Sequence, residues 1–138
     1  FTAEVAWLLG PVMIFALAIT VFLGIRAYRA GADTKHLFVA TFLTATLDLI
    51  VFNKVGSPQF ELWLAVPLMA GILFELPKWR LPIALGLSIA LLTNLLYPIF
   101  YMDLMVLGWL GIAILTVRNV LLVALLVWAN LRLSKIAN

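Results

Sequence analysis

Long apolar runs separated by short polar segments constrain the fold of this sequence more than any other feature. Four runs are Val5–Ile25, Leu37–Phe52, Leu62–Leu76 and Leu81–Tyr97, and a fifth lies within Asp103–Leu133. A helix of about 20 apolar residues crosses the hydrocarbon core of a bilayer. Only 11% of the residues are charged, against roughly a quarter in soluble domains, so lipid must cover much of the surface. We therefore predict an all-α fold, a polytopic transmembrane bundle of about five helices forming a single domain over residues 1–138.

Glycine and proline residues predict where these helices begin and end. Pro11 lies early in the first run, where proline kinks or starts a helix. Gly31 is the expected break after the first helix, and Asp33 or Thr34 is the expected N-cap of the second. The fourth helix is expected to stop before Pro98.

The fifth region, Asp103–Leu133, is too long for one perpendicular span, at about 46 Å as a helix. Arg118 lies in its middle, and a charged Arg at the bilayer centre is costly. We therefore predict a short interfacial or re-entrant segment over Leu104–Thr116, followed by a span over Val117–Leu133. This arrangement would place Arg118 at the outer mouth of the bundle.

Lys and Arg are distributed unevenly over the two sides of the predicted bundle. Cytoplasmic loops of membrane proteins are enriched in these residues. Lys54 falls on one side with Arg118 near it, whereas the other basic residues assigned to a side fall on the opposite one: Arg26, Arg29, Lys35, Lys78, Arg80, Arg132 and Lys135. We predict a multi-pass protein of the cell membrane with a cytoplasmic C-terminus. The N-terminus and the loops at 53–61 and 97–103 would face outward.

The side chains that most metal and cofactor sites need are scarce in this sequence. There is no Cys, and His36 is the single histidine, which excludes disulfides and argues against a zinc or haem site built on imidazoles. No dinucleotide-binding, P-loop, zinc-protease or nucleophile-elbow motif is present. The net charge of +3 comes from short basic clusters, without a basic stripe that would bind nucleic acid. We expect membrane lipids as neighbours and no metal, cofactor or nucleic acid.

Polar residues inside the apolar runs are candidates for function, because they are costly in lipid. Thr41, Thr44 and Asp48 are spaced at i, i+3 and i+7, on one face of the second helix. They are either a hydrogen-bonding stripe between helices, or Asp48 orients Lys54 or Arg118 or contacts a hydroxylated substrate.

The end of the fourth run repeats this spacing with Asn94, Tyr97 and Tyr101. Tyrosines at this level are either membrane anchors or, at the mouth of a cavity, side chains that stack on a sugar and donate hydrogen bonds to it.

Lys54 and Arg118 are cations on the side where the distribution of charge disfavours them. They either contact lipid headgroups or a local carboxylate, or they bind a phosphate or pyrophosphate at the outer interface. The turn that contains Ser57 would bring a hydroxyl and backbone N–H groups to the same place, and Gln59 could fix the orientation of the ligand.

Two blocks of sequence resemble a known class of enzyme. The segment KVGSPQFELW, residues 54–63, is similar to a K-V-x-S-P-Q-[YF]-x-x-W segment of bacterial GT-C-fold membrane glycosyltransferases, the polyprenol-phosphate-mannose-dependent mannosyltransferases and their relatives. Tyr97-Pro98, Tyr101 and the segment LTVRN at 115–119 resemble the block that closes the same proteins.

The resemblance implies transfer of a sugar, in this family mannose, from a polyprenyl-phosphate carrier on the outer side of the membrane. It implies that Lys54 and Arg118 bind the donor phosphate, assisted by Ser57 and Gln59, with Asp48, Tyr97 and Tyr101 as further substrate-binding candidates. The acidic general base of the family belongs to an N-terminal loop of a much longer protein and has no counterpart here. The chain would then be a C-terminal part of the enzyme or one subunit of a split enzyme.

Two other classes of function remain open from the residues. One is a small lipid-handling transporter, which should show internal repeats or broken helices facing each other at the membrane midplane. The other is a structural or assembly subunit whose task is helix packing.

Overall fold

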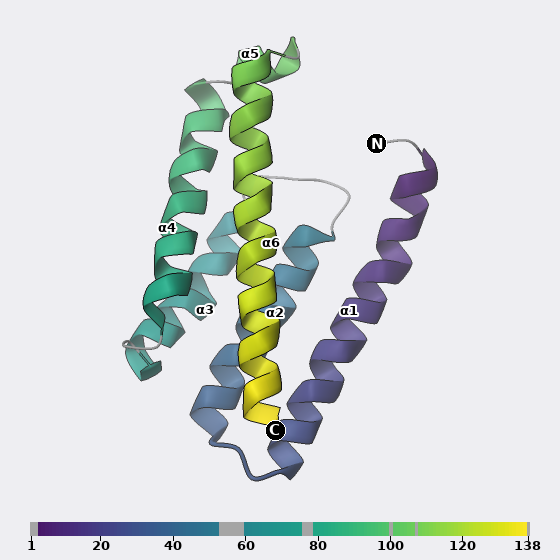
Figure 1. The fold of residues 1–138 in the computed structure, drawn as a ribbon, viewed down its shortest axis with the longest axis vertical. Helices are drawn as coiled ribbons and strands as arrows, with labels where there is room; N and C mark the ends of the chain where they lie inside the picture. The colour runs from purple at the N-terminus through teal and green to yellow at the C-terminus, as the bar shows by residue number, and fades with distance from the viewer. Residues whose placement is uncertain (1–2, 53–59, 76–78, 100, 107, 138) are drawn as a thin grey trace.

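The computed structural model describes residues 3–52, 60–75, 79–99, 101–106 and 108–137. Within these ranges the chain forms six α-helices and no strand, which confirms the predicted all-α fold class. The helices are α1 (Ala3–Arg29), α2 (Thr34–Val51), α3 (Phe60–Glu75), α4 (Arg80–Asn94), α5 (Tyr101–Met105) and α6 (Trp109–Ala137), and a π-helical turn, Leu95–Ile99, follows α4. Figure 1 shows the long helices running roughly up and down one bundle.

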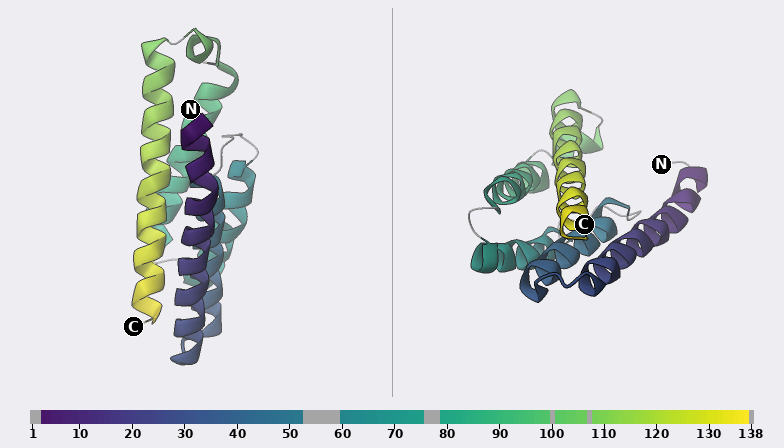
Figure 2. Two further views of the ribbon diagram at one scale, coloured as in Figure 1. Left: turned by 90° about the vertical axis from the view of Figure 1, so that its right-hand side faces the viewer. Right: turned by 60° about the horizontal axis from the view of Figure 1, so that its bottom comes forward.

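Helix α2 lies at the centre of the bundle. It packs against α1, α3 and α6, and α6 in turn packs against α1 and α4. The N-terminal end of α1 stands away from the other helices in Figure 1 and in the right-hand view of Figure 2. Only the C-terminal part of α1 is therefore placed to join the interior of the bundle closely.

The core is built from aliphatic side chains of the central helices and from two tryptophans. Leu43 and Leu47 of α2 and Leu125 of α6 are fully buried. Trp79, at the start of α4, is also buried and meets Trp128 of α6 edge to face, with 5.4 Å between the ring centroids. Dispersion contacts of this kind hold helices together where lipid supplies no hydrophobic drive.

The turn between α1 and α2 has the predicted chemistry. Gly31 has a φ of 82°, the left-handed conformation in which a helix often ends and which only glycine adopts without strain. Asp33 is the N-cap of α2, and its carboxylate accepts a hydrogen bond from the backbone N–H of Lys35 at 3.0 Å. Both sequence-based boundaries are therefore confirmed.

The predicted division of the fifth region is wrong. Helix α6 continues from Trp109 to Ala137, so no break separates Leu104–Thr116 from the span predicted at Val117–Leu133. The short helix α5 and the start of α6 occupy that segment instead. A break is unnecessary because α6 buries Arg118 against another helix, at 4% exposure, rather than presenting it to lipid.

Pro11 and Pro98 lie inside helical segments of the structure. Pro11 lies inside α1 without starting or ending it. The regular α-helix of α4 ends at Asn94, before the expected Tyr97, and the π-helical turn then continues through Pro98. A wider turn accommodates the missing N–H group and the ring of proline, so the chain remains helical there.

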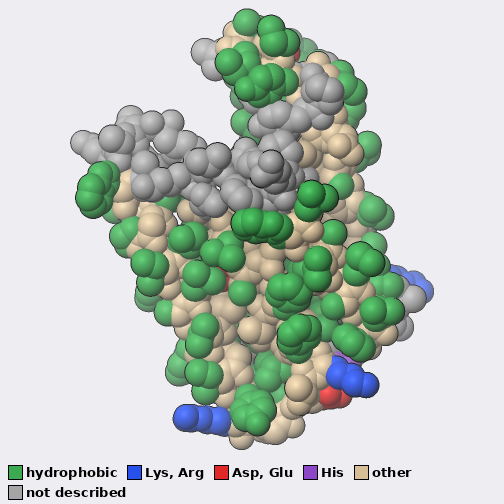
Figure 3. Space-filling view, turned by 180° about the vertical axis from the view of Figure 1, so that it is seen from behind, with side chains coloured by type: hydrophobic (Ala, Val, Ile, Leu, Met, Phe, Trp, Pro, Cys, Tyr) green, Lys and Arg blue, Asp and Glu red, His purple; other side chains and the backbone are tan. Residues whose placement is uncertain are grey.

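Three of the described helices are long and apolar enough to cross a membrane: Trp7–Arg29, Thr34–Val51 and Trp109–Ile136. Two apolar helices, Leu62–Phe74 and Arg80–Asn94, are shorter. Hydrophobic side chains are spread over the described part of the face seen in Figure 3, and its Lys and Arg side chains lie in the lower half. This surface suits a lipid environment, as the composition predicts.

Candidate functional site

A buried carboxyl group joins α2 to α1. Asp48 is 2% exposed, and its Oδ2 atom lies 2.6 Å from the hydroxyl oxygen of Thr20, which is also buried. The Thr20 hydroxyl lies 3.1 Å from the carbonyl oxygen of Ala16, one turn earlier in α1. Asp48 thus forms a hydrogen-bonded contact between two helices. Such a contact is expected if the polar residues of α2 serve helix packing.

The other members of that stripe act locally. Thr44 is buried and donates to the carbonyl oxygen of Ala40 at 2.7 Å, within its own helix. The Thr41 hydroxyl is buried, and the described part of the structure gives it no hydrogen-bond partner. Among the described contacts of these three residues, the one polar contact with another helix is that of Asp48.

A buried guanidinium joins α6 to α4. The Nε atom of Arg118 donates to the hydroxyl of Thr93 at 2.9 Å, and that hydroxyl donates to the carbonyl oxygen of Ile89 at 2.9 Å. A second Arg118 nitrogen lies 3.4 Å from the side-chain oxygen of Asn119. The long side chain is thus held in a fixed position between two helices.

The hydrogen bonds given for Asp48 and Arg118 lead to different helices. Asp48 contacts α1, and Arg118 contacts α4. The hypothesis that Asp48 orients Arg118 stays a prediction. Lys54, Ser57 and Gln59 lie outside the described residues, so their predicted joint site with Arg118 stays a prediction.

Asp103 has a structural task at the start of α6. Its carboxylate accepts a hydrogen bond from the backbone N–H of Gly111 at 2.7 Å, and its carbonyl oxygen accepts one from Gly108 at 2.7 Å. A Cβ atom at Gly108 would collide with this carboxylate, so only glycine fits there. The acidic cap satisfies an N–H group of the first turn and favours the positive end of the helix dipole.

The aromatic residues of the predicted outer mouth are only partly described. Tyr101 lies in α5 and is 42% exposed, and Asn94 ends α4 with its side chain exposed. The backbone of Tyr97 belongs to the π-helical turn, and its side chain lies outside the described part. The exposure of Tyr101 suits either of the two roles considered for it.

Sequence reasoning missed Thr20 and Thr93, the partners of the two buried charged groups. Each is a threonine in the middle or final third of an apolar helix, where its hydroxyl can bond to a carbonyl one turn earlier. The available signal was that a buried charged group needs a polar partner on a neighbouring helix. Nothing in the sequence identified which threonine that would be.

The described residues contain no group of three or more His, Asp or Glu side chains that could hold a metal ion. No protein-family model, curated protein or solved structure matches the chain. The buried polar contacts and the sequence resemblance are therefore the features of the chain that bear on its function.

Proposed function

We propose that the chain is the carrier-phosphate-binding membrane part of a glycosyltransferase that uses a polyprenyl-phosphate-linked sugar. The observation that carries the proposal is the position of Arg118, a guanidinium that is 4% exposed and anchored through Nε to Thr93. Anchoring through Nε sets the direction in which the outer edge of a guanidinium points. That edge carries the paired N–H groups that match two oxygens of a phosphate.

The surroundings of Arg118 favour binding of an anion. Arg118 belongs to the first half of α6, whereas Arg132 and Lys135 lie near its other end. A guanidinium removed from water has a stronger electrostatic interaction with a phosphate than an exposed one. Hydrogen bonds to the neutral side chains of Thr93 and Asn119 help to position this cation.

The proposal also fixes an orientation and a partner. The donor phosphate would approach from the outer side of the cell membrane, and the C-terminus of α6 would be cytoplasmic. Lys54, Ser57 and Gln59 would complete the phosphate site, and Tyr101 would contact the sugar. The general base would come from a preceding part of the protein or from a partner membrane subunit, and the sugar would be mannose if the resemblance extends to the donor.

A structural or assembly subunit is the second candidate. A specific observation favours it: the hydrogen bonds given for both buried charged groups lie within the bundle, from Asp48 to Thr20 and from Arg118 to Thr93. Contacts of this kind are sufficient for helix packing. On this alternative, replacing Arg118 changes stability and has no effect on a ligand.

The test is binding of a short polyprenyl-phosphate mannose to the purified chain in nanodiscs. We expect wild type to bind, Arg118→Lys to bind more weakly because it loses the bidentate fork, and Arg118→Ala to lose binding. Arg80→Ala is the matched control, because Arg80 is an exposed arginine at the start of α4. Equal binding by all four proteins, or none by wild type, would overturn the proposal and favour the packing subunit.

A further inference from the structure

An open groove lies between α1 and α2 on the surface of the bundle. It has a volume of about 450 Å³, and apolar side chains form most of its wall. Its lining includes Val21 and Ile25 of α1 and Phe38 and Phe42 of α2. On α2 the groove extends from Thr34, the first residue of the helix, to Ala45, a distance of about 16 Å along the axis.

Glycine keeps this groove open on the α1 side. Gly24 lines it, and an added Cβ there would meet the Thr41 side chain at 3.5 and 3.6 Å, an ordinary van der Waals distance. Alanine should therefore fit at position 24, whereas a longer side chain would fill the groove. Substitution of Gly24 by alanine and by a longer side chain therefore distinguishes an effect on the groove from an effect on the fold.

Basic residues lie at the α1–α2 turn, next to one end of the groove. Arg29 follows Ile25 by four residues and Val21 by eight, so all three lie on one face of α1. Because side chains of a helix lean toward its N-terminus, we expect Arg29 to reach back toward this end of the groove. Arg26 and Lys35 are exposed at the same turn.

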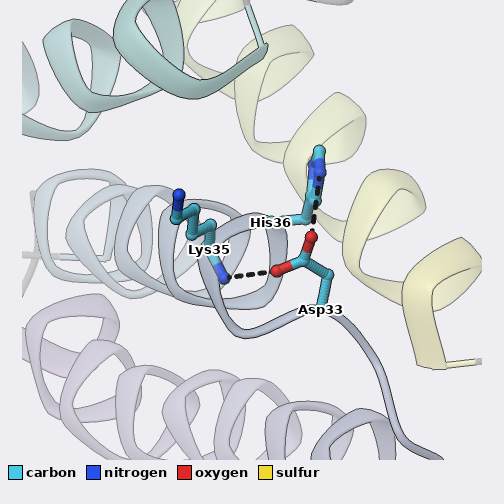
Figure 4. A network of polar contacts seen from close by, with 3 residues as sticks. All are labelled: Asp33, Lys35 and His36. Carbon is cyan, nitrogen blue, oxygen red and sulfur yellow. Dashed lines mark hydrogen bonds and ion pairs between the residues drawn. The ribbon is translucent and has the colours of Figure 1, made fainter.

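One carboxylate at this turn is already engaged. Asp33 accepts a hydrogen bond from the Lys35 backbone at 3.0 Å, and its other oxygen lies 3.5 Å from Nε2 of His36 (Figure 4). The Lys35 ammonium lies 5.8 Å from the centre of the Phe74 ring, toward α3. The segment from Arg26 to His36 thus contains three Lys and Arg residues and one carboxylate, which is held by its own helix, so this segment has an excess of positive charge.

We propose that this groove binds an anionic phospholipid of the bilayer, with one acyl chain along α1 and α2 and the phosphate at Arg29. The combination of features selects this ligand. The groove begins at the end of a helix, where headgroups lie, and continues into the apolar zone, where chains lie. Basic residues at this level attract anionic headgroups, whereas a zwitterionic lipid gains less from them.

The site is independent of the proposed phosphate site at Arg118. Arg29 is the last residue of α1, whereas Arg118 belongs to the first half of α6 and contacts α4. A bilayer phospholipid and a polyprenyl-phosphate sugar can therefore be tested separately, and failure of one proposal leaves the other standing.

Native mass spectrometry of the full chain, released from micelles that contain equal phosphatidylglycerol and phosphatidylcholine, tests the proposal. We expect wild type to retain phosphatidylglycerol preferentially and Arg29→Gln to retain about fivefold less of it, the effect of one basic residue at a membrane surface. Arg80→Gln, an exposed arginine on α4, is the matched control and should retain as much as wild type. Gly24→Leu should lose both lipids, and Gly24→Ala should keep them.

Three results would overturn this inference. One is equal retention of the two lipids by wild type, and another is an equal loss in Arg29→Gln and Arg80→Gln, which would reflect general charge alone. The third is a dimer that disappears in Gly24→Leu, because a second copy of the chain would then fill the groove. If Gly24→Leu does not fold, as judged by circular dichroism, the pair of arginine variants still decides.

Discussion

Two buried contacts between helices in this bundle are built alike but differ in whether enough protons are available for their hydrogen bonds. In each, a charged side chain meets a threonine on a neighbouring helix: Arg118 with Thr93, and Asp48 with Thr20. The Thr93 hydroxyl donates its one proton to a carbonyl oxygen and accepts from the guanidinium. The Thr20 hydroxyl lies near two acceptors, the Asp48 carboxyl oxygen and a carbonyl oxygen, and has only one proton for them.

The difference follows from the chemistry of threonine in a helix. Its hydroxyl usually donates to a carbonyl one turn earlier, which leaves a lone pair for a donor on another helix. Arginine has only donors and fits this arrangement, whereas a carboxylate competes for the same proton. We therefore infer that the contact of α6 with α4 is the more specific of the two, and that substitutions can measure the difference.

The largest effect is expected for Thr93→Val. This change keeps the shape of the side chain and removes the acceptor of Arg118 Nε, at a cost of about 2 kcal/mol because the hydrogen bond involves a charged group. Reversible unfolding in mixed micelles, titrated with a denaturing detergent, measures it. Arg118→Met should cost less, because it removes the buried charge together with its requirement for a partner. A larger cost for Arg118→Met than for Thr93→Val would contradict this account.

A smaller effect, about 1 kcal/mol, is expected for Thr20→Val. The variant removes the hydroxyl that contacts Asp48, and interhelical hydrogen bonds between such groups in membranes are weak on average. The same unfolding titration applies, with Thr46→Val as the control. Thr46 donates only to a carbonyl oxygen of its own helix in the described structure, at 2.8 Å, so its loss should cost little. The comparison of the two contacts fails if Thr20→Val costs more than Thr93→Val.

Asp48→Asn should change stability by less than about 0.5 kcal/mol, within the range of mild substitutions. The amide group of asparagine can donate to the Thr20 hydroxyl, which then donates to the Ala16 carbonyl oxygen, so the competition for one proton ends. Asp48→Leu is the variant to compare with it, because leucine has neither the negative charge nor the hydrogen-bonding capacity of Asp48. Thermal unfolding of the two variants side by side is sufficient, and a strong loss in Asp48→Asn would indicate that the negative charge itself is required.

The smallest effect is expected on the outer face of α1. Phe15 is 67% exposed, so truncation to alanine leaves no cavity in the described core. We expect its unfolding free energy in micelles to remain within about 0.5 kcal/mol of wild type. A loss comparable with that of Thr93→Val would mean that this face of α1 packs against another protein surface under the conditions used.

The sequence predicted the helices and the turn chemistry well, because both depend on local signals. The apolar runs, the break at Gly31 and an N-cap at Asp33 or Thr34 could be predicted from residue types and spacing alone, and the structure shows the cap to be Asp33. The continuity of α6 could not, because it depends on where Arg118 is buried. A charged residue in an apolar run predicts a break only when lipid surrounds it, and the packing of α4 against α6 removes that condition.

The candidate site was predictable only in part, for a related physical reason. Asp48 and Arg118 could be identified because ionisable groups are rare in such helices. Their partners could not, because hydrogen bonds between helices depend on crossing geometry and on the relative rotation of the helices. The spacing of Thr41, Thr44 and Asp48 correctly indicated one face of α2, but it did not indicate that α1 would cover that face at Thr20.

The cap formed by Asp103 also makes the connection before α6 a spacer of fixed length. The backbone N–H of Gly111 donates a hydrogen bond to the carboxylate of Asp103, eight residues earlier. This bond fixes the position of the first turn of α6 relative to Asp103. Deleting one residue between them would rotate the rest of α6 by about 100°, unless the cap were lost. Arg118 would then turn away from Thr93, and Leu125 would leave the core. Residues 104–107 should therefore accept substitutions more readily than any insertion or deletion, since their number sets the rotational phase of the longest helix.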